Sequence, residues 1–133
     1  MTRDILLGSV VVFIAWAILD YLIHGVLLMP TYEQTADLWR PTGEMKPWLM
    51  WIVNLIAAVC LVAVYAVFFK AKNIRNGLVY GLLVGIAWGA GMGYGSYSYM
   101  PIPYFLAQAW FWAKVVELIV AGALMGLIVK DKT

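Results

Sequence analysis

The stretch that decides the fold is residues 77–100, GLVYGLLVGIAWGAGMGYGSYSYM. It carries no formal charge over 24 residues, and about 20 helical residues are enough to cross the hydrocarbon core of a membrane. Five of its glycines, which we call the glycine ladder, recur at every fourth position: Gly77, Gly81, Gly85, Gly89 and Gly93. Because glycine has no side chain, such a row lets two membrane helices bring their backbones close together. The stretch predicts a tightly packed transmembrane helix.

Three other apolar runs of similar length follow the same pattern, over residues 5–29, 48–69 and 104–129. The chain of 133 residues is 65% hydrophobic and only 12% charged, whereas about a quarter of a soluble domain is charged. The first run is too long for the apolar core of a signal peptide, about 7–15 residues, so we expect it to be retained. The sequence predicts an all-α membrane protein, a single domain over residues 1–133 built as a bundle of four transmembrane helices.

Lysine and arginine are distributed unevenly between the two ends of this bundle. Six of them lie at the termini and in the connection between the second and third helices, and two lie in the connection between the first and second. The positive-inside rule therefore predicts that both termini are cytoplasmic. The net charge of +2 offers no basic surface to nucleic acid, so the expected partners are the lipid bilayer and other membrane chains.

The glycine ladder drifts about 40° around a straight helix at each step. We therefore expect it to face two different neighbours along its length, or to follow a right-handed crossing. Gly122 and Gly126 add one GxxxG pair in the fourth helix. Packing within one bundle and packing against a second copy or a larger partner both remain open. Four glycines between residues 89 and 95 also favour a local kink or unwinding.

Five polar or ionisable residues stand inside the expected helices: Asp20, His24, Asn54, Lys114 and Glu117. Because a charge at the bilayer centre costs several kcal/mol, such residues are expected to face protein or water and to pair. Asp20 and His24 are four apart, and Lys114 and Glu117 are three apart, so each pair shares a helix face. At about 1.5 Å per residue, all five fall in the outer half of the membrane or near its middle. We expect the first, second and fourth helices to gather them in one polar cluster.

Several roles for this cluster are open. It can serve as a structural lock of ion pairs and hydrogen bonds, as a path for a proton or another cation, or as a metal site formed by Asp20, His24 and Glu117. A metal is disfavoured, because three ligands are one short of a closed structural zinc site and because Lys114 competes electrostatically. No cofactor is expected, since a single histidine offers a haem one axial ligand only.

The sequence contains none of the common enzyme motifs. It has no HExxH motif, no phosphate-binding loop before a helix and no Ser–His–Asp arrangement at a plausible depth, so no catalytic residue is assigned. We therefore expect a non-enzymatic structural or accessory component that self-associates or joins a larger membrane complex through its glycine-lined helix faces. The alternative is a small proton- or cation-coupled transporter that uses Asp20, His24 and Glu117.

Short segments along the chain carry a resemblance: LDYLIHGVLL at 19–28, LWRP at 38–41, PIP at 101–103, AWF at 109–111, VE at 116–117 and AGA at 121–123. In these segments the chain resembles a group of small four-helix bacterial membrane proteins to which no activity is assigned. The resemblance covers nearly the whole chain and implies a location in the bacterial inner membrane. Lys114 departs from the group, in which a small residue is expected there, so a charge pair with Lys114 would be a feature of this chain.

Overall fold

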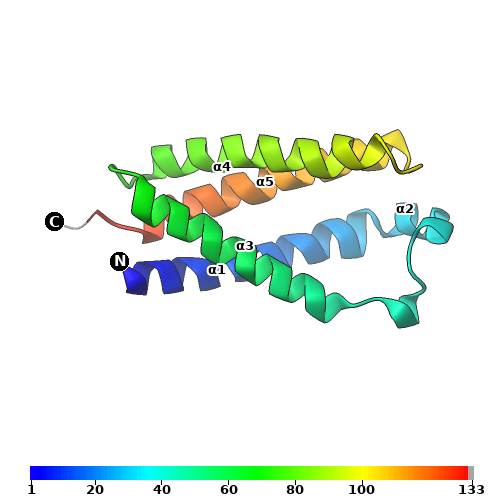
Figure 1. Ribbon diagram of the computed structural model, residues 1–133, viewed down its shortest axis with the longest axis horizontal. Helices are drawn as coiled ribbons and strands as arrows, with labels where there is room; N and C mark the ends of the chain where they lie inside the picture. Colours follow the sequence, from blue (N-terminus) through cyan, green and yellow to red (C-terminus); the bar gives the residue numbers. More distant parts are fainter. Residues whose placement is uncertain (132–133) are drawn as a thin grey trace.

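The computed structural model describes residues 1–131, and every regular element in that range is a helix. Four helical segments are long and apolar enough to span a membrane: Thr2–Leu27, Pro47–Phe68, Ile74–Gly95 and Tyr104–Ile128. They run alternately in opposite directions, so both termini lie at one end of the bundle (Figure 1). The prediction of an all-helical fold with four helices long and apolar enough to span a membrane is confirmed for the described residues. Lys132, one of the six basic residues counted above, lies outside the described residues.

Two of the four spans change helix type before they end. The first span is α1 (Thr2–Leu22) followed by the π-helical turn η1 (Ile23–Leu27), and the third is α4 (Ile74–Gly89) followed by the π-helical turn η4 (Ala90–Gly95). In a π-helical turn the backbone hydrogen bonds join residues five apart. Such turns are rare overall, but those that occur are often at functional sites. Three of the six residues of η4 are glycines, so the unwinding expected near residues 89–95 takes this form.

The second and fourth spans are α-helical throughout. α3 (Pro47–Phe68) begins at a proline, whose fixed φ suits the first helical position, and α5 (Tyr104–Ile128) begins directly after Pro103. The predicted ends differ from these by one residue or none. The largest difference is in the third span, which closes at Gly95 and leads into turns before Pro101, whereas the sequence predicted a helix to residue 100.

The connection between the first and second spans folds back on the bundle. It contains one short helix and two 3-10 turns: α2 (Met29–Gln34), η2 (Ala36–Leu38) and η3 (Thr42–Glu44). Tyr32, Leu38 and Trp39 from this connection pack against a buried apolar cluster that includes Leu106 and Trp110 of α5. The connection thus covers one end of the bundle, opposite the termini, and brings its aromatic side chains to α5.

The glycine ladder packs against α5 along its whole length. A Cβ atom placed on any of the five ladder glycines would lie 3.0 Å or less from an atom of α5. Gly77 meets Gly122 and Gly126 near the termini, and Gly93 meets Ala107 at the opposite end. The expectation of two different neighbours is therefore wrong. Because a π-helical turn holds more residues than an α-helical one, η4 offsets part of the drift between the last two ladder glycines.

Two apolar clusters fill the interior, one toward each end of the bundle. The cluster toward the termini is the larger: Val12, Trp16, Ala58, Leu61, Val62, Tyr65, Ala66, Leu118, Ala121, Met125 and Val129. The cluster toward the opposite end consists of Leu28, Ile102, Leu106, Ala107 and Trp110. Trp110 and Leu118 of α5 belong to different clusters, so the stretch of α5 between them lies between the two apolar layers.

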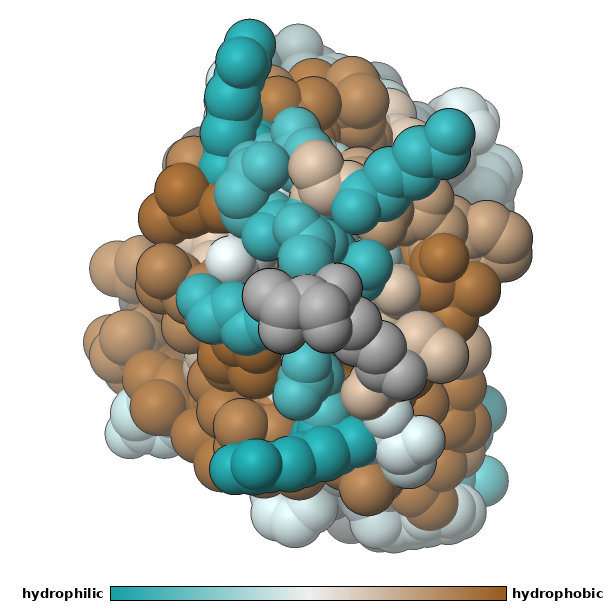
Figure 2. Space-filling model, turned by 90° about the vertical axis from the view of Figure 1, so that its left-hand side faces the viewer, coloured by the Kyte–Doolittle hydropathy of each residue, from teal (hydrophilic) through white to brown (hydrophobic). Residues whose placement is uncertain are grey.

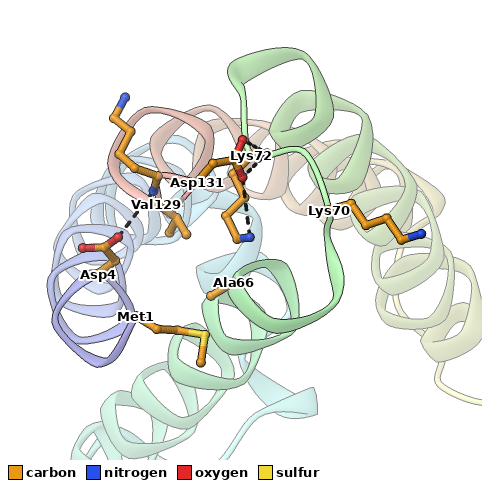
Figure 3. Close-up of a pocket in the computed structure, with 8 residues that line it drawn as sticks. Met1, Asp4, Ala66, Lys70, Lys72, Val129 and Asp131 are labelled. Atoms are coloured by element: carbon orange, nitrogen blue, oxygen red, sulfur yellow. Dashed lines mark hydrogen bonds and ion pairs between the residues drawn. The ribbon is translucent and has the colours of Figure 1, made fainter. Parts of the chain in front are cut away.

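The end that carries both termini is polar, and Figure 2 shows hydrophilic residues gathered at its centre within a surround of apolar ones. A pocket of about 260 Å³ opens there between the termini and the α3–α4 connection (Figure 3). The Asp131 carboxylate accepts the backbone N–H of Lys72 at 3.1 Å and lies 3.6 Å from its ammonium group. The backbone N–H of Lys130 donates to Asp4 at 3.4 Å. Acidic and basic groups are mixed in this pocket, so it does not favour a ligand of one charge.

Candidate functional site

The layer between the two apolar clusters contains all five intramembrane polar residues predicted from the sequence. Asp20 comes from the last turns of α1 and His24 from η1, while Asn54 comes from α3. Lys114 and Glu117 come from α5. Asn54, Lys114 and Glu117 are buried, whereas the side chains of Asp20 and His24 retain 25% and 29% of their exposure. The first, second and fourth spans therefore meet at one polar site that keeps some access from outside.

Asp20 is held by a side chain of a neighbouring helix. The Nδ2 of Asn54 donates a hydrogen bond to Asp20 Oδ2 at 2.9 Å. The other carboxylate oxygen, Oδ1, lies 4.0 Å from His24 Nε2, which is too long for a hydrogen bond. Asn54 thus fixes the Asp20 carboxylate through one oxygen and leaves the other directed at the imidazole ring.

Glu117 and Lys114 form the most buried ion pair of the described residues. Lys114 Nζ donates to Glu117 Oε2 at 2.6 Å, and the two side chains are 9% and 1% exposed. The same ammonium group lies 5.4 Å from the centre of the Trp88 ring, close enough for a cation–π interaction. Glu117 Oε1 is buried and, with both carboxylates ionised, has no hydrogen-bond donor among the described residues; a proton shared with the neighbouring Asp20 carboxyl group would supply one. A buried carboxylate oxygen without a donor is unusual, because its desolvation is then uncompensated.

His24 is held by Tyr32, which the sequence analysis did not assign to the site. His24 Nδ1 and the Tyr32 hydroxyl are hydrogen-bonded at 2.6 Å, and the indole N–H of Trp110 donates to the same hydroxyl at 2.8 Å. Burial raises the pKa of Tyr32 to about 12, so the hydroxyl stays protonated at neutral pH. Tyr32 joins the outer connection, η1 and α5 at one point.

Two tryptophans also border the site and were not predicted. The indole N–H of Trp16 donates to the backbone carbonyl of Glu117 at 2.9 Å, and Trp16 meets Trp88 edge-to-face with ring centres 6.2 Å apart. Trp16 lies four residues before Asp20 on the same helix face, which is a signal that the sequence did contain. No comparable signal identifies Tyr32, because its position depends on how the outer connection folds back.

The candidate ligand atoms converge. Asp20, His24 and Glu117 each offer one atom such that the three atoms lie within 4.8 Å of one another. Each residue also has one polar atom held by a partner: Asn54 for Asp20, Tyr32 for His24 and Lys114 for Glu117. When both carboxylates are ionised, Lys114 is protonated and His24 is neutral, the site carries one negative charge in excess. In that state the arrangement can accept a cation between three side chains, each of which is held at one atom.

The seven glycines assigned to helix packing lie elsewhere. They form the seam between α4 and α5: Gly77, Gly81, Gly85, Gly89, Gly93, Gly122 and Gly126. Their faces are covered within the chain, so an assembly through these faces would have to displace α5 or α4. The cluster and the seam meet at Gly89, where the position of a Cβ lies 3.4 Å from the Cβ of Lys114.

No protein-family model matches the chain, and neither a curated protein nor a solved structure matches it.

Proposed function

We propose that this chain is a small integral membrane transporter that takes up a proton or another cation at the Asp20–His24–Glu117 cluster. The observation that supports this function best is the convergence of three anchored side chains on one point, with a buried oxygen of Glu117 that has no donor among the described residues. A structural lock would be expected to satisfy that oxygen, because an unpaired buried acceptor destabilises the fold. A cation arriving at the site supplies the missing partner.

In this proposal the protein is a multi-pass protein of the bacterial inner membrane, with both termini in the cytoplasm. The support is the excess of lysine and arginine at the end that carries the termini, together with the resemblance described above. The cluster then lies toward the periplasmic side, and a cation reaches Asp20 and His24 from there, since these two side chains keep partial exposure.

A carrier also needs a second state in which the site opens to the other side. The two π-helical turns are suitable places for such a change, because helices bend where the regular hydrogen-bond ladder is interrupted. η1 contains His24 itself, and η4 ends the helix whose Trp88 ring faces Lys114. A small rotation at η1 would change the surroundings of the cluster without disturbing the glycine seam, whereas a rotation at η4 would also move Gly93 of the seam.

Flux measurements in liposomes test this function. The purified chain is reconstituted with a pH-sensitive dye inside, and proton uptake is followed after a pH jump, with potassium and valinomycin clamping the potential. We expect flux well above that of empty liposomes, and a loss of about tenfold or more in Glu117→Gln, because Gln keeps the shape but cannot carry the charge.

Glu33→Gln is the matched control, because Glu33 is exposed in α2 and has no part in the cluster. Equal flux in both variants would contradict the proposal, as would a wild-type protein that moves no proton, monovalent cation or divalent cation above the background of empty liposomes.

A second function, as an accessory component of a membrane assembly, has one observation in its favour. α3 crosses α1 obliquely (Figure 1), and residues 47–53 at its start are exposed on every side. This stretch includes Trp48 and Trp51, which are 58% and 66% exposed. Since the glycine seam is covered, assembly would use this part of α3. Mass measurement of the protein in native nanodiscs tests it: a monomer that carries no copurified chain contradicts the accessory function.

A further inference from the structure

We propose that the cluster binds one divalent first-row transition-metal cation, of which Zn²⁺ is the test case, through Asp20 Oδ1, His24 Nε2 and a carboxylate oxygen of Glu117. This inference rests on the proposed function that the cluster takes up a cation, and it names the class of cation. The observation behind it is a pattern of hydrogen bonds. In each of the three residues a partner holds one polar atom, and a second polar atom remains available to a ligand.

The donor set points to this class of metal. One imidazole nitrogen and two carboxylate oxygens suit Zn²⁺ and its first-row neighbours, whereas Ca²⁺ takes six to eight oxygen ligands and Mg²⁺ keeps several waters. One ligand atom from each of the three residues lies within 4.8 Å of the other two, and His24 Nε2 is 4.0 Å from Asp20 Oδ1. Metal–ligand bonds of about 2.0–2.2 Å need these atoms to approach by roughly 1 Å, which small side-chain rotations provide.

The outer partners match what a metal site requires. A histidine that binds metal through one nitrogen usually donates its other N–H to an acceptor, and ligating carboxylates are hydrogen-bonded in turn. In the tautomer that carries its proton on Nδ1, His24 donates to the Tyr32 oxygen, which also accepts from Trp110, and Nε2 is then free to bind the metal. Asn54 supports Asp20 in the same way.

Lys114 is the apparent objection, because its charge opposes a metal. The structure places its ammonium group on Glu117 Oε2, while Oε1 has no donor among the described residues. Lys114 therefore supports Glu117 from the side, and the face of Trp88 gives its charge a second partner. A metal with three protein ligands keeps an open position. An open position suits a cation that is exchanged and not one that is held permanently.

Binding of Zn²⁺ to the full chain in nanodiscs tests the inference. The purification tag must contain no histidine, and zinc chloride is titrated by isothermal calorimetry. We expect one saturable site per chain. His24→Ala and Glu117→Gln should weaken binding by about tenfold or more, and Tyr32→Phe by about tenfold, the usual effect of losing an outer partner. Lys114→Gln should tighten binding severalfold, because it removes a positive charge and keeps a donor on Glu117. Glu33→Gln should leave binding unchanged.

The single histidine supplies a second measurement that does not depend on variants. In protein labelled with ¹⁵N in its imidazole ring, Zn²⁺ bound at Nε2 shifts the resonance of that nitrogen far more than that of Nδ1. Absence of a saturable site, or Zn²⁺ binding that survives His24→Ala unchanged, overturns the inference. Proton flux that depends on Glu117 without any Zn²⁺ binding would overturn the metal and leave the proposed function standing. Zn²⁺ binding without flux of any cation would do the reverse.

Discussion

In the seam between α4 and α5, backbone atoms occupy the space that side chains take elsewhere. A Cβ on Gly77 or Gly81 would overlap a carbonyl oxygen of α5, so the seam is closed to any added atom. In the polar cluster, long side chains reach into the space between α1, α3 and α5, and at least one buried oxygen, Glu117 Oε1, is left without a donor among the described residues. The seam therefore has no room for a further atom, whereas the polar cluster still offers an unpaired hydrogen-bond acceptor.

This contrast suggests how the two regions divide the work. Close backbone contact fixes the position of α5 relative to α4, since neither helix can shift without a clash. α5 also carries Lys114 and Glu117, so the seam sets the place from which these two side chains enter the cluster. A rigid pair of helices can then present a site whose side chains retain freedom to rearrange around a cation.

The largest expected effect tests whether the cluster is more than an ion pair. In Lys114→Met the Glu117 carboxylate stays buried without its partner, and breaking one side of a buried pair costs about 3–5 kcal/mol. The double variant Lys114→Met/Glu117→Leu removes both charges and should recover most of that stability. Unfolding in mixed micelles with increasing SDS measures both.

The double variant also separates the two roles of the cluster. If the pair only stabilises the fold, the double variant behaves like the wild type in every assay. We expect a stable protein with no cation flux. Flux at the wild-type level in the double variant would show that Glu117 has no part in transport.

The next effect concerns the seam. Gly81→Ala adds one carbon that would overlap the Leu118 carbonyl oxygen, whereas Gly91→Ala adds the same carbon where no atom lies within 4 Å. We expect Gly81→Ala to destabilise the fold by about 1–3 kcal/mol through overpacking, and Gly91→Ala to have little effect. The same SDS titration compares them. If both variants unfold at the same SDS fraction, the seam is looser than described and cannot be what positions α5.

Much of the fold followed from the sequence because its signals are local. Long apolar runs mark membrane spans, Pro47 and Pro103 mark where helices begin, and glycines four apart mark a seam. The sequence did not predict that the whole ladder would face α5, because the rotation of the ladder around its helix was calculated for a straight α-helix. The whole ladder nevertheless lies along α5, and the π-helical turn at residues 90–95 offsets part of the drift near its end.

The site likewise contains residues that the sequence identified and residues that it did not. Asp20, His24, Asn54, Lys114 and Glu117 could be singled out because an ionisable or amide group within an apolar span is conspicuous. Trp110 shares the helix face of Lys114 and Glu117 and was therefore visible in the sequence, whereas Trp88 is an ordinary member of an apolar helix, and only the packing of α4 and α5 shows that it faces a polar group. Which carboxylate oxygen Lys114 takes is likewise invisible before side chains are placed; the expectation against a metal rested on the number of ligands and on the charge of Lys114.

The smallest effect concerns Tyr32, which joins the outer connection to the cluster. Tyr32→Phe removes the hydroxyl that bonds His24 and Trp110, and we expect a loss of about 1 kcal/mol. Tyr21→Phe is the control, because Tyr21 is 68% exposed.

The pKa of Tyr32 is raised from 10.0 to about 12, so its protonated form is stabilised by folding. That contribution is complete below pH 10 and is lost as the pH rises through 12. The stability difference between wild type and Tyr32→Phe should therefore be constant between pH 8 and 9, above the ordinary titration range of histidine, and narrow above pH 10. A difference that grows in that range would mean that the phenolate form is the one bound, and that Tyr32 accepts from both neighbours as an anion.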